Sequence, residues 1–232
     1  MKSIMTSVSP YLCERIVSGD CKILVKKSAP KEVPFKAFIY CTKMRKKDDL
    51  ITKSENFGWI RCAASSLFNR AEEYDSNGKV IGEFICDKVE NFYCASVPYQ
   101  KENNLGYGQF VDNGVYKMNG WHEGVVFERN DRYIDTMLNN NDLKEMCLSA
   151  QELFDYIGIG KHLYAWHISD LKIYDRPREL SDFIKRCNCK GHCFMCEREI
   201  VKQDKSKQMC VCYEKASRPP QSYMFVEEIE TK

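Results

Sequence analysis

The chain lacks any long hydrophobic run and carries almost no net charge. None of its apolar stretches approaches the roughly 20 residues that a membrane-spanning helix needs, so we expect no membrane span. The first ten residues contain one lysine, but Ser and Thr interrupt their apolar stretch, which makes a poor signal peptide. A formal net charge of +2 excludes a tail that coats polyanions. We therefore expect a cytoplasmic globular protein.

The near-neutral total conceals two basic zones. Residues 1–53 hold 12 Lys and Arg against 5 Asp and Glu, and residues 185–218 hold 9 against 4. Hydrophobic residues make up 44% and charged residues 29%, as in a folded globular chain. Together the two zones predict one positive face, which a phosphate-bearing partner requires. The alternative is a solvated surface with ordinary lysines.

Cysteine is unusually frequent, with 13 residues in a chain that shows no export signal. A disulfide scaffold is not expected, because the cytosol keeps thiols reduced. Seven cysteines are scattered through apolar contexts and are expected to pack as small hydrophobic side chains. The other six crowd into 26 positions: Cys187, Cys189, Cys193, Cys196, Cys210 and Cys212.

The spacing of these six thiols predicts a structural zinc site. Cys193-Phe-Met-Cys196 is a knuckle whose two thiolates can hold one tetrahedral ion. A short segment without a core of its own would gain stability from the metal. Reduced, metal-free thiols and a redox pair remain as alternatives. The favoured ligands are Cys189, Cys193, Cys196 and Cys212, with Cys187, Cys210 and His192 as alternates.

Local patterns predict an α+β fold with short elements. Helices are expected after Ser9-Pro10, after the capping box Ser149–Glu152, and over 179–185. A turn is expected at Asn77-Gly78. Residues 98–130, with five glycines, are expected to form a turn-rich excursion. Strands are expected over 3–8, 23–25, 37–41, 79–86 and 163–174, with Val80, Gly82, Phe84 and Cys86 on one side of their strand.

Three stretches resemble a known family: residues 9–31 with 38–43, residues 163–180, and residues 218–228. In this order they resemble ASCH-domain proteins of the PUA-like superfamily, in the cysteine-bearing subgroup of bacterial mobile elements and phages. The resemblance covers roughly residues 1–95 and 145–228 and implies a small β-barrel with flanking helices. It also implies a basic cleft suited to RNA or an extruded base, in a bacterial or phage-infected cell.

The resemblance sets the expected domain boundary as well. An ASCH domain is expected over residues 1–184, with an insertion at about 98–130. A Cys-rich metal-binding extension is expected over 185–232, returning to the barrel.

Some family members hydrolyse an acetylated cytidine nucleoside through the pattern Gly-x-Lys-Thr-x-(Thr or Glu)-x-Arg. The corresponding stretch here begins at Gly19 and places Cys21 at the lysine position, Leu24 at the threonine position and Lys26 at the arginine position. Leucine can neither activate water nor assist a nucleophile, so inherited amidase chemistry is not expected. The alternative catalytic set is Cys21, Lys22 and Glu83.

The leading hypothesis is therefore a non-enzymatic RNA-binding protein. Lysine and arginine side chains would contact phosphates, while Tyr40 or Trp166 would stack on a base and His167 would line the cleft. In the competing interpretation, Trp166 is a core residue and His167 is hydrogen-bonded at the rim of the cleft. Two alternatives remain: a hydrolase acting on a modified nucleoside or RNA, and a phage-encoded inhibitor of a host ribonucleoprotein that uses residues 98–130. The predicted phosphate contacts are Lys22, Lys26, Lys27, Lys31, Lys43, Arg45, Lys46 and Lys47.

Overall fold

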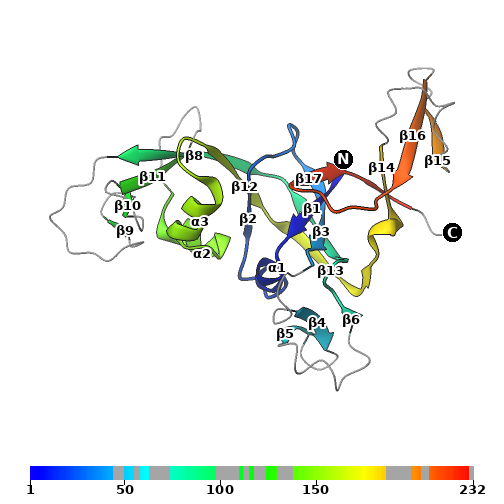
Figure 1. The fold of residues 1–232 in the computed structure, drawn as a ribbon, viewed down its shortest axis with the longest axis horizontal. Helices are drawn as coiled ribbons and strands as arrows, with labels where there is room; N and C mark the ends of the chain where they lie inside the picture. The colour runs from blue at the N-terminus through cyan, green and yellow to red at the C-terminus, as the bar shows by residue number, and fades with distance from the viewer. Residues whose placement is uncertain are drawn as a thin grey trace. The chain divides into compact units, whose positions relative to one another are not determined.

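In the computed structural model, the described residues are mostly β-strand, with a few short helices (Figure 1). The described ranges are 1–43, 50–54, 58–62, 74–97, 110–111, 115–117, 124–129, 138–186, 200–204 and 209–229. The α+β class is thereby confirmed. The strands in these ranges form four open sheets, and no closed barrel of the predicted kind is present among them. No helix within the same ranges is long and apolar enough to cross a membrane.

The chain divides into two compact units, each built from separate stretches of sequence. Unit 1 comprises Met1–Glu14, Phe35–Ile85 and Asp170–Lys232, and unit 2 comprises Arg15–Pro34 and Cys86–Ser169. The boundary expected between residues 184 and 185 lies within β14 (Phe183–Arg186), a strand of unit 1. That strand pairs with segments that follow the boundary, so sequence on both sides of it belongs to one sheet.

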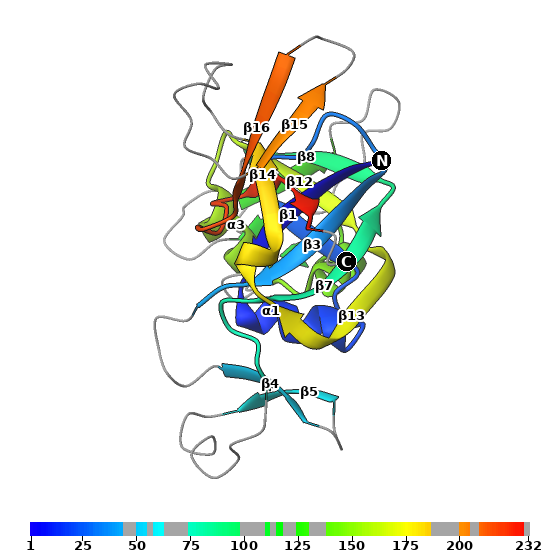
Figure 2. The ribbon, with the colours of Figure 1, turned by 90° about the vertical axis from the view of Figure 1, so that its right-hand side faces the viewer.

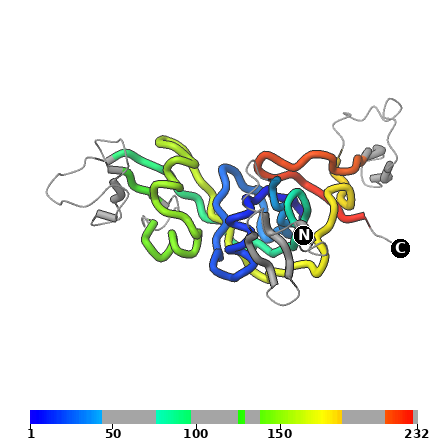
Figure 3. The backbone as a smooth tube through the Cα atoms, turned by 60° about the horizontal axis from the view of Figure 1, so that its bottom comes forward, coloured from blue at the N-terminus to red at the C-terminus, as the bar shows by residue number. Residues whose placement is uncertain are grey.

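The main sheet of unit 1 has the strand order β13-β7-β3-β1-β17. β1 (Lys2–Val8) and β3 (Phe35–Cys41) lie side by side (Figure 2) and run parallel. In their register, Met5 is opposite Phe38. β17 (Tyr223–Phe225) pairs antiparallel with the other edge of β1, so the C-terminal segment returns to the N-terminal strand (Figure 3). Helix α1 (Pro10–Val17) follows β1, as the Ser-Pro signal predicted.

Strand β7 (Val80–Cys86) begins after the predicted turn at Asn77-Gly78. The four residues expected on one side of this strand are all buried. Gly82 is required there, because a Cβ atom on it would lie 2.5 Å from the carbonyl oxygen of Lys172 in β13 (Ser169–Arg178). The two strands can therefore approach this closely only with glycine at position 82.

The second sheet of unit 1 contains β15 (Ile200–Asp204), β16 (Met209–Lys215), β14 and β18 (Glu227–Glu228), in that order. The predicted helix over 179–185 is wrong: a 3₁₀ turn at Leu180–Asp182 leads directly into β14. The reason is tertiary, since Phe183 is fully buried with its ring centroid 4.8 Å from that of Phe38.

A third, three-stranded sheet completes the described part of unit 1. It has the order β5-β4-β6, from β4 (Leu50–Ser54), β5 (Gly58–Cys62) and β6 (Tyr74–Asp75).

Unit 2 is a six-stranded sheet covered on one face by two helices (Figure 1). α2 (Asn140–Met146) and α3 (Ala150–Ile157) contribute Met146, Leu153 and other apolar side chains to the core of this unit. The predicted capping box is confirmed: the Ser149 hydroxyl accepts from the Glu152 amide, and the Glu152 carboxylate accepts from the Ser149 amide. The strand order is β2 (Ile23–Lys26), β12 (His162–His167), β8 (Val89–Val97), β11 (Gly124–Arg129), β10 (Val115–Lys117) and β9 (Phe110–Val111).

Two expectations for unit 2 need qualification. The stretch 163–174 is not one strand, because β12 ends at His167 and β13 begins at Ser169 in a different sheet. Asp170 has a positive φ of 46° just after this break. Within 98–130, the described residues form β9, β10 and β11, which extend the sheet from β8. The protein partner proposed for that region stays a prediction.

Candidate nucleic-acid interface

The basic segment 22–31 lies in unit 2, on β2 and the loop that follows it. It contains four lysines and no acidic residue. Lys22, Lys27 and Lys31 are exposed, whereas Lys26 is buried, with only 6% of its surface accessible. Three of the four predicted lysines can therefore reach a phosphate from the surface, and the burial of Lys26 favours a structural role for that residue.

Backbone hydrogen bonds fix the start of this segment. The Lys22 amide donates to the Glu145 carbonyl oxygen over 2.8 Å, and the Ile168 amide donates to the Lys22 carbonyl oxygen over 2.9 Å. The Lys22 side chain remains 67% exposed, and its ammonium is 3.8 Å from the exposed Glu145 carboxylate. An ion pair this exposed contributes little and leaves the ammonium able to exchange partners.

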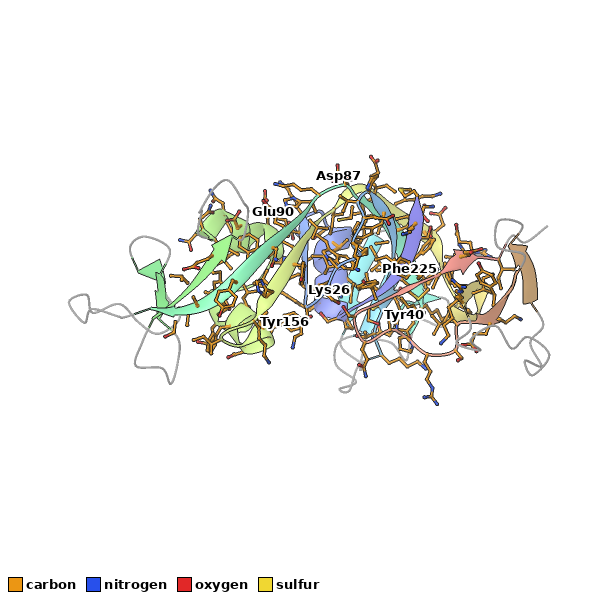
Figure 4. All side chains as sticks on the ribbon, turned by 90° about the horizontal axis from the view of Figure 1, so that it is seen from above. Lys26, Tyr40, Asp87, Glu90, Tyr156 and Phe225 are labelled. Carbon is orange, nitrogen blue, oxygen red and sulfur yellow. The ribbon has the colours of Figure 1, made fainter. Side chains whose placement is uncertain are left out.

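An exposed aromatic ring accompanies the lysines. Tyr156 extends from α3 (labelled in Figure 4), and the Lys27 ammonium lies 4.6 Å from the centre of its ring. Tyr156 as a whole residue is 41% exposed. Burial of the hydroxyl end raises the pKa of Tyr156, while a hydrogen bond from the Lys27 backbone opposes that shift. The ring is thus held at the surface beside a cation, as in sites that stack bases.

Sequence reasoning missed Tyr156, although a signal was present. Leu153, Phe154 and Ile157 form the buried stripe of α3. A residue between Phe154 and Ile157 must point away from that stripe, so an aromatic side chain at 156 projects toward solvent.

The two aromatic residues chosen from the sequence are buried instead. Trp166 is fully buried and Tyr40 is 4% exposed in the core of unit 1. Burial also raises the pKa of Tyr40. A buried ring offers no free face to a base, so the burial of these two residues does not favour a stacking role.

His167 is held by a buried carboxylate. Its Nε2 lies 2.8 Å from Oε2 of Glu90, whose Oε1 lies 2.9 Å from the Lys88 ammonium. The Glu90 side chain is only 6% exposed, while that of His167 is 27% exposed. This arrangement corresponds to the competing interpretation, in which Trp166 is a core residue and His167 is hydrogen-bonded at the rim.

Of the remaining predicted cations, only Lys43 is among the described residues. Lys43 is exposed in unit 1, where its aliphatic stem lies over Gly78, a residue with a φ of +85°. Arg45, Lys46 and Lys47 lie outside the described residues.

The alternative catalytic residues show little of the chemistry expected of them. Cys21 is buried, and its thiol donates to the carbonyl oxygen of Ile23 over 3.4 Å. Burial raises the pKa of Cys21 to about 12, so the thiolate that a nucleophile needs is rare at neutral pH. Glu83 belongs to unit 1, where its carboxylate accepts hydrogen bonds from Lys36 and Tyr174. These environments speak against the hydrolase hypothesis.

The predicted zinc ligands fall largely outside the described residues. Cys210 and Cys212 are described and occupy alternate positions in β16, opposite Gln203 and Val201. The candidates outside the described residues are Cys187, Cys189, Cys193, Cys196 and His192. Within the described ranges there is no group of three or more metal-binding side chains. The zinc site therefore stays a prediction.

Comparisons with known proteins give one finding. No protein-family model and no curated protein matches the sequence. Among solved structures, the chain is similar to a crystal structure of a mutant of ZmASCH from Zymomonas mobilis. The two chains are 13% identical with a TM-score of 0.42, over 98% of this chain and 91% of that one. The name of that protein contains the name of the family that the three sequence stretches resemble. A similarity at this level assigns no function to this chain.

Proposed function

We propose that this protein binds single-stranded RNA, without cleaving or deacylating it, through the segment 22–31 and Tyr156. The observation that carries the proposal is the pair formed by the Lys27 ammonium and the exposed Tyr156 ring. Lys22 and Lys31 add two more exposed cations in a stretch without acidic residues. Cations beside an exposed ring are the elements with which proteins bind unpaired strands.

RNA is favoured over DNA by the sequence resemblance. The three stretches that resemble ASCH-domain proteins imply a basic cleft suited to RNA. Tyr156 can stack on any unpaired base, because every base presents a π face.

The experiment measures binding of a labelled mixed-sequence RNA by fluorescence anisotropy over a range of salt concentrations. For single strands the affinity falls with salt by a log–log slope of roughly 0.7 for each phosphate contact. The variant K22Q/K27Q/K31Q should therefore lower the slope by about 2. Tyr156→Leu should weaken binding by roughly tenfold, because one stacked base is lost.

Matched controls separate this segment from general positive charge. Lys144→Gln with Lys161→Gln removes two exposed lysines of the same unit and should change the affinity little. Trp166→Phe should also leave binding unchanged, because the indole is buried. Salt-independent binding, or equal losses in the control and the triple variant, would contradict the proposal. Incubated RNA should stay intact, and turnover of RNA or acetylated cytidine would favour the hydrolase alternative.

We also propose a structural zinc ion bound by the cysteine cluster. The support is the spacing of six cysteines within 26 positions around a Cys-x-x-Cys knuckle. Purified protein should contain about one zinc ion per chain by elemental analysis. Cys193→Ser with Cys196→Ser should abolish zinc binding, whereas Cys147→Ser, outside the cluster, should not. Zinc-free protein prepared without chelators would contradict this proposal.

A further inference from the structure

Unit 1 has an open cleft of about 490 Å³ at the edge of its main sheet. Its walls come from β3, β7, β13 and β18, all within this unit. A volume of this size accommodates a small molecule or a single nucleotide. The lining residues are Lys36, Glu83, Lys172, Ile173, Tyr174, Asp175, Arg176, Arg178 and Glu228.

Strand β13 supplies most of the polar groups. Side chains at alternate positions of a strand point to the same side, so Lys172, Tyr174, Arg176 and Arg178 share one face of β13. Lys172 and Arg176 are exposed, one on each side of the half-buried Tyr174. Each is two residues from Tyr174, or about 7 Å along the strand, so their long side chains can reach one ligand on this face of β13. The guanidinium of Arg178 lies over the Tyr174 ring, 5.8 Å from its centre.

The floor of the cleft is fixed by internal pairs. The Tyr174 hydroxyl donates to Glu83 Oε2 over 2.7 Å, and the Lys36 ammonium lies 3.2 Å from Glu83 Oε1. Burial, followed by the Glu83 hydrogen bond, raises the pKa of Tyr174, so its phenol remains a donor. Arg178 is bonded to Glu228, with its guanidinium 4.6 Å from the centre of the Phe183 ring. These contacts hold the groups in place before a ligand arrives.

The charge of the lining favours an anion. Its ionised side chains comprise four cations and three carboxylates, a surplus of one positive charge. Glu83 and Glu228 are both matched inside the cleft, by Lys36 and Arg178. Among the residues that the structure describes, Lys172 makes no ion pair. An exposed lysine and an exposed arginine on the same face suit a phosphate group. Its oxygens can accept hydrogen bonds from the lysine ammonium and, in pairs, from the planar guanidinium of the arginine.

We propose that this cleft binds the phosphate group of a nucleotide, with Lys172 and Arg176 contacting the phosphate oxygens. The choice of a nucleotide over other phosphate carriers rests on the proposed RNA binding. The same chemistry would accept a free nucleoside monophosphate or a 5′-phosphorylated RNA end. Glu83 lines the cleft, and each of its carboxylate oxygens can accept one hydrogen bond from the base or sugar besides those from Lys36 and Tyr174.

Calorimetric titration with adenosine 5′-monophosphate and with inorganic phosphate tests the site. Both should bind saturably at millimolar concentrations or below. K172Q/R176Q should weaken binding by about tenfold for each cation, because a charge-assisted hydrogen bond is lost. Lys215→Gln, at an exposed position in β16, is the matched control and should have no effect.

Glu83→Gln gives an effect of opposite sign. The amide keeps the size of the side chain and an acceptor for Tyr174, but it removes a negative charge from the wall of the cleft. Binding of inorganic phosphate, which has no base or sugar to contact residue 83, should therefore tighten by about threefold. A general loss of structure would weaken binding, so tighter binding cannot come from damage to the fold.

Further measurements distinguish a free nucleotide from an RNA end as the ligand, and the cleft proposal from the proposed RNA binding. If the cleft binds the end of an RNA, a 5′-phosphorylated RNA should bind more tightly than the same RNA with a 5′-hydroxyl end. If the ligand is a free nucleotide, the two RNAs should bind with equal affinity. K22Q/K27Q/K31Q should weaken RNA binding but leave monophosphate binding unchanged. The cleft proposal would be overturned, even if RNA binding is confirmed, if neither adenosine 5′-monophosphate nor inorganic phosphate binds saturably. It would also be overturned if Lys215→Gln weakens their binding as much as K172Q/R176Q does. Loss of salt-sensitive RNA binding alone would overturn only the proposed function.

Discussion

Replacing Gly82 with alanine should lower the free energy of unfolding by about 3 kcal/mol, at the upper end of the usual cost of overpacking. The added Cβ would lie 2.5 Å from the Lys172 carbonyl oxygen and 3.1 Å from the Ile173 Cα atom. Both are backbone atoms of the neighbouring strand, so neither can move aside by changing a rotamer. The clash must separate β7 from β13 at the edge of the sheet.

Urea denaturation of the variant measures this loss, and Gly19→Ala is the informative comparison. Gly19 has a φ of +79°, and a Cβ atom added there would meet nothing within 4 Å. Its substitution therefore costs only backbone strain, about 1 kcal/mol. Similar stabilities for the two variants would show that close strand approach is not what requires glycine at 82. The same experiment bears on the cleft, because Lys172 and Ile173 line it.

Cys21 should react with iodoacetamide on the order of a thousandfold more slowly in the folded protein than in the unfolded chain. The raised pKa of about 12, against 9.0 for an unperturbed thiol, reduces the thiolate at pH 8 by that factor. Because burial raises this pKa, the rate should increase about tenfold for each pH unit throughout the range from about 8 to 11. Peptide mapping by mass spectrometry gives the rate for each cysteine separately.

Cys147 provides the internal comparison for this measurement. Its side chain is half-buried, and burial raises its pKa as well, against the neighbouring Arg15 charge, which lowers it. It should be labelled faster than Cys21 in the folded protein, because reagent can reach it. Labelling of Cys21 at the rate of an exposed thiol would restore it as a candidate nucleophile and revive the hydrolase hypothesis.

Local signals in the sequence determined three of the short features. The Ser-Pro start of α1, the capping box of α3 and the Asn-Gly turn before β7 appear where they were predicted. Each depends on hydrogen bonds or backbone angles within a few residues, so the sequence alone contains the necessary information. The basic character of 22–31 is equally a property of the sequence.

The burial and the long-range contacts of individual side chains depend on the tertiary structure. Alternation over 163–174 predicts extended backbone, but it carries no sign that the chain leaves one sheet for another near Ile168. Likewise Trp166 is buried because distant segments cover its position in β12. Lys27 reaches Tyr156, and Lys36 and Tyr174 meet at Glu83, only because pairs far apart in sequence are brought together by folding. Hydrophobic burial has no fixed range along the chain, so such contacts have no local signature that sequence reasoning could detect.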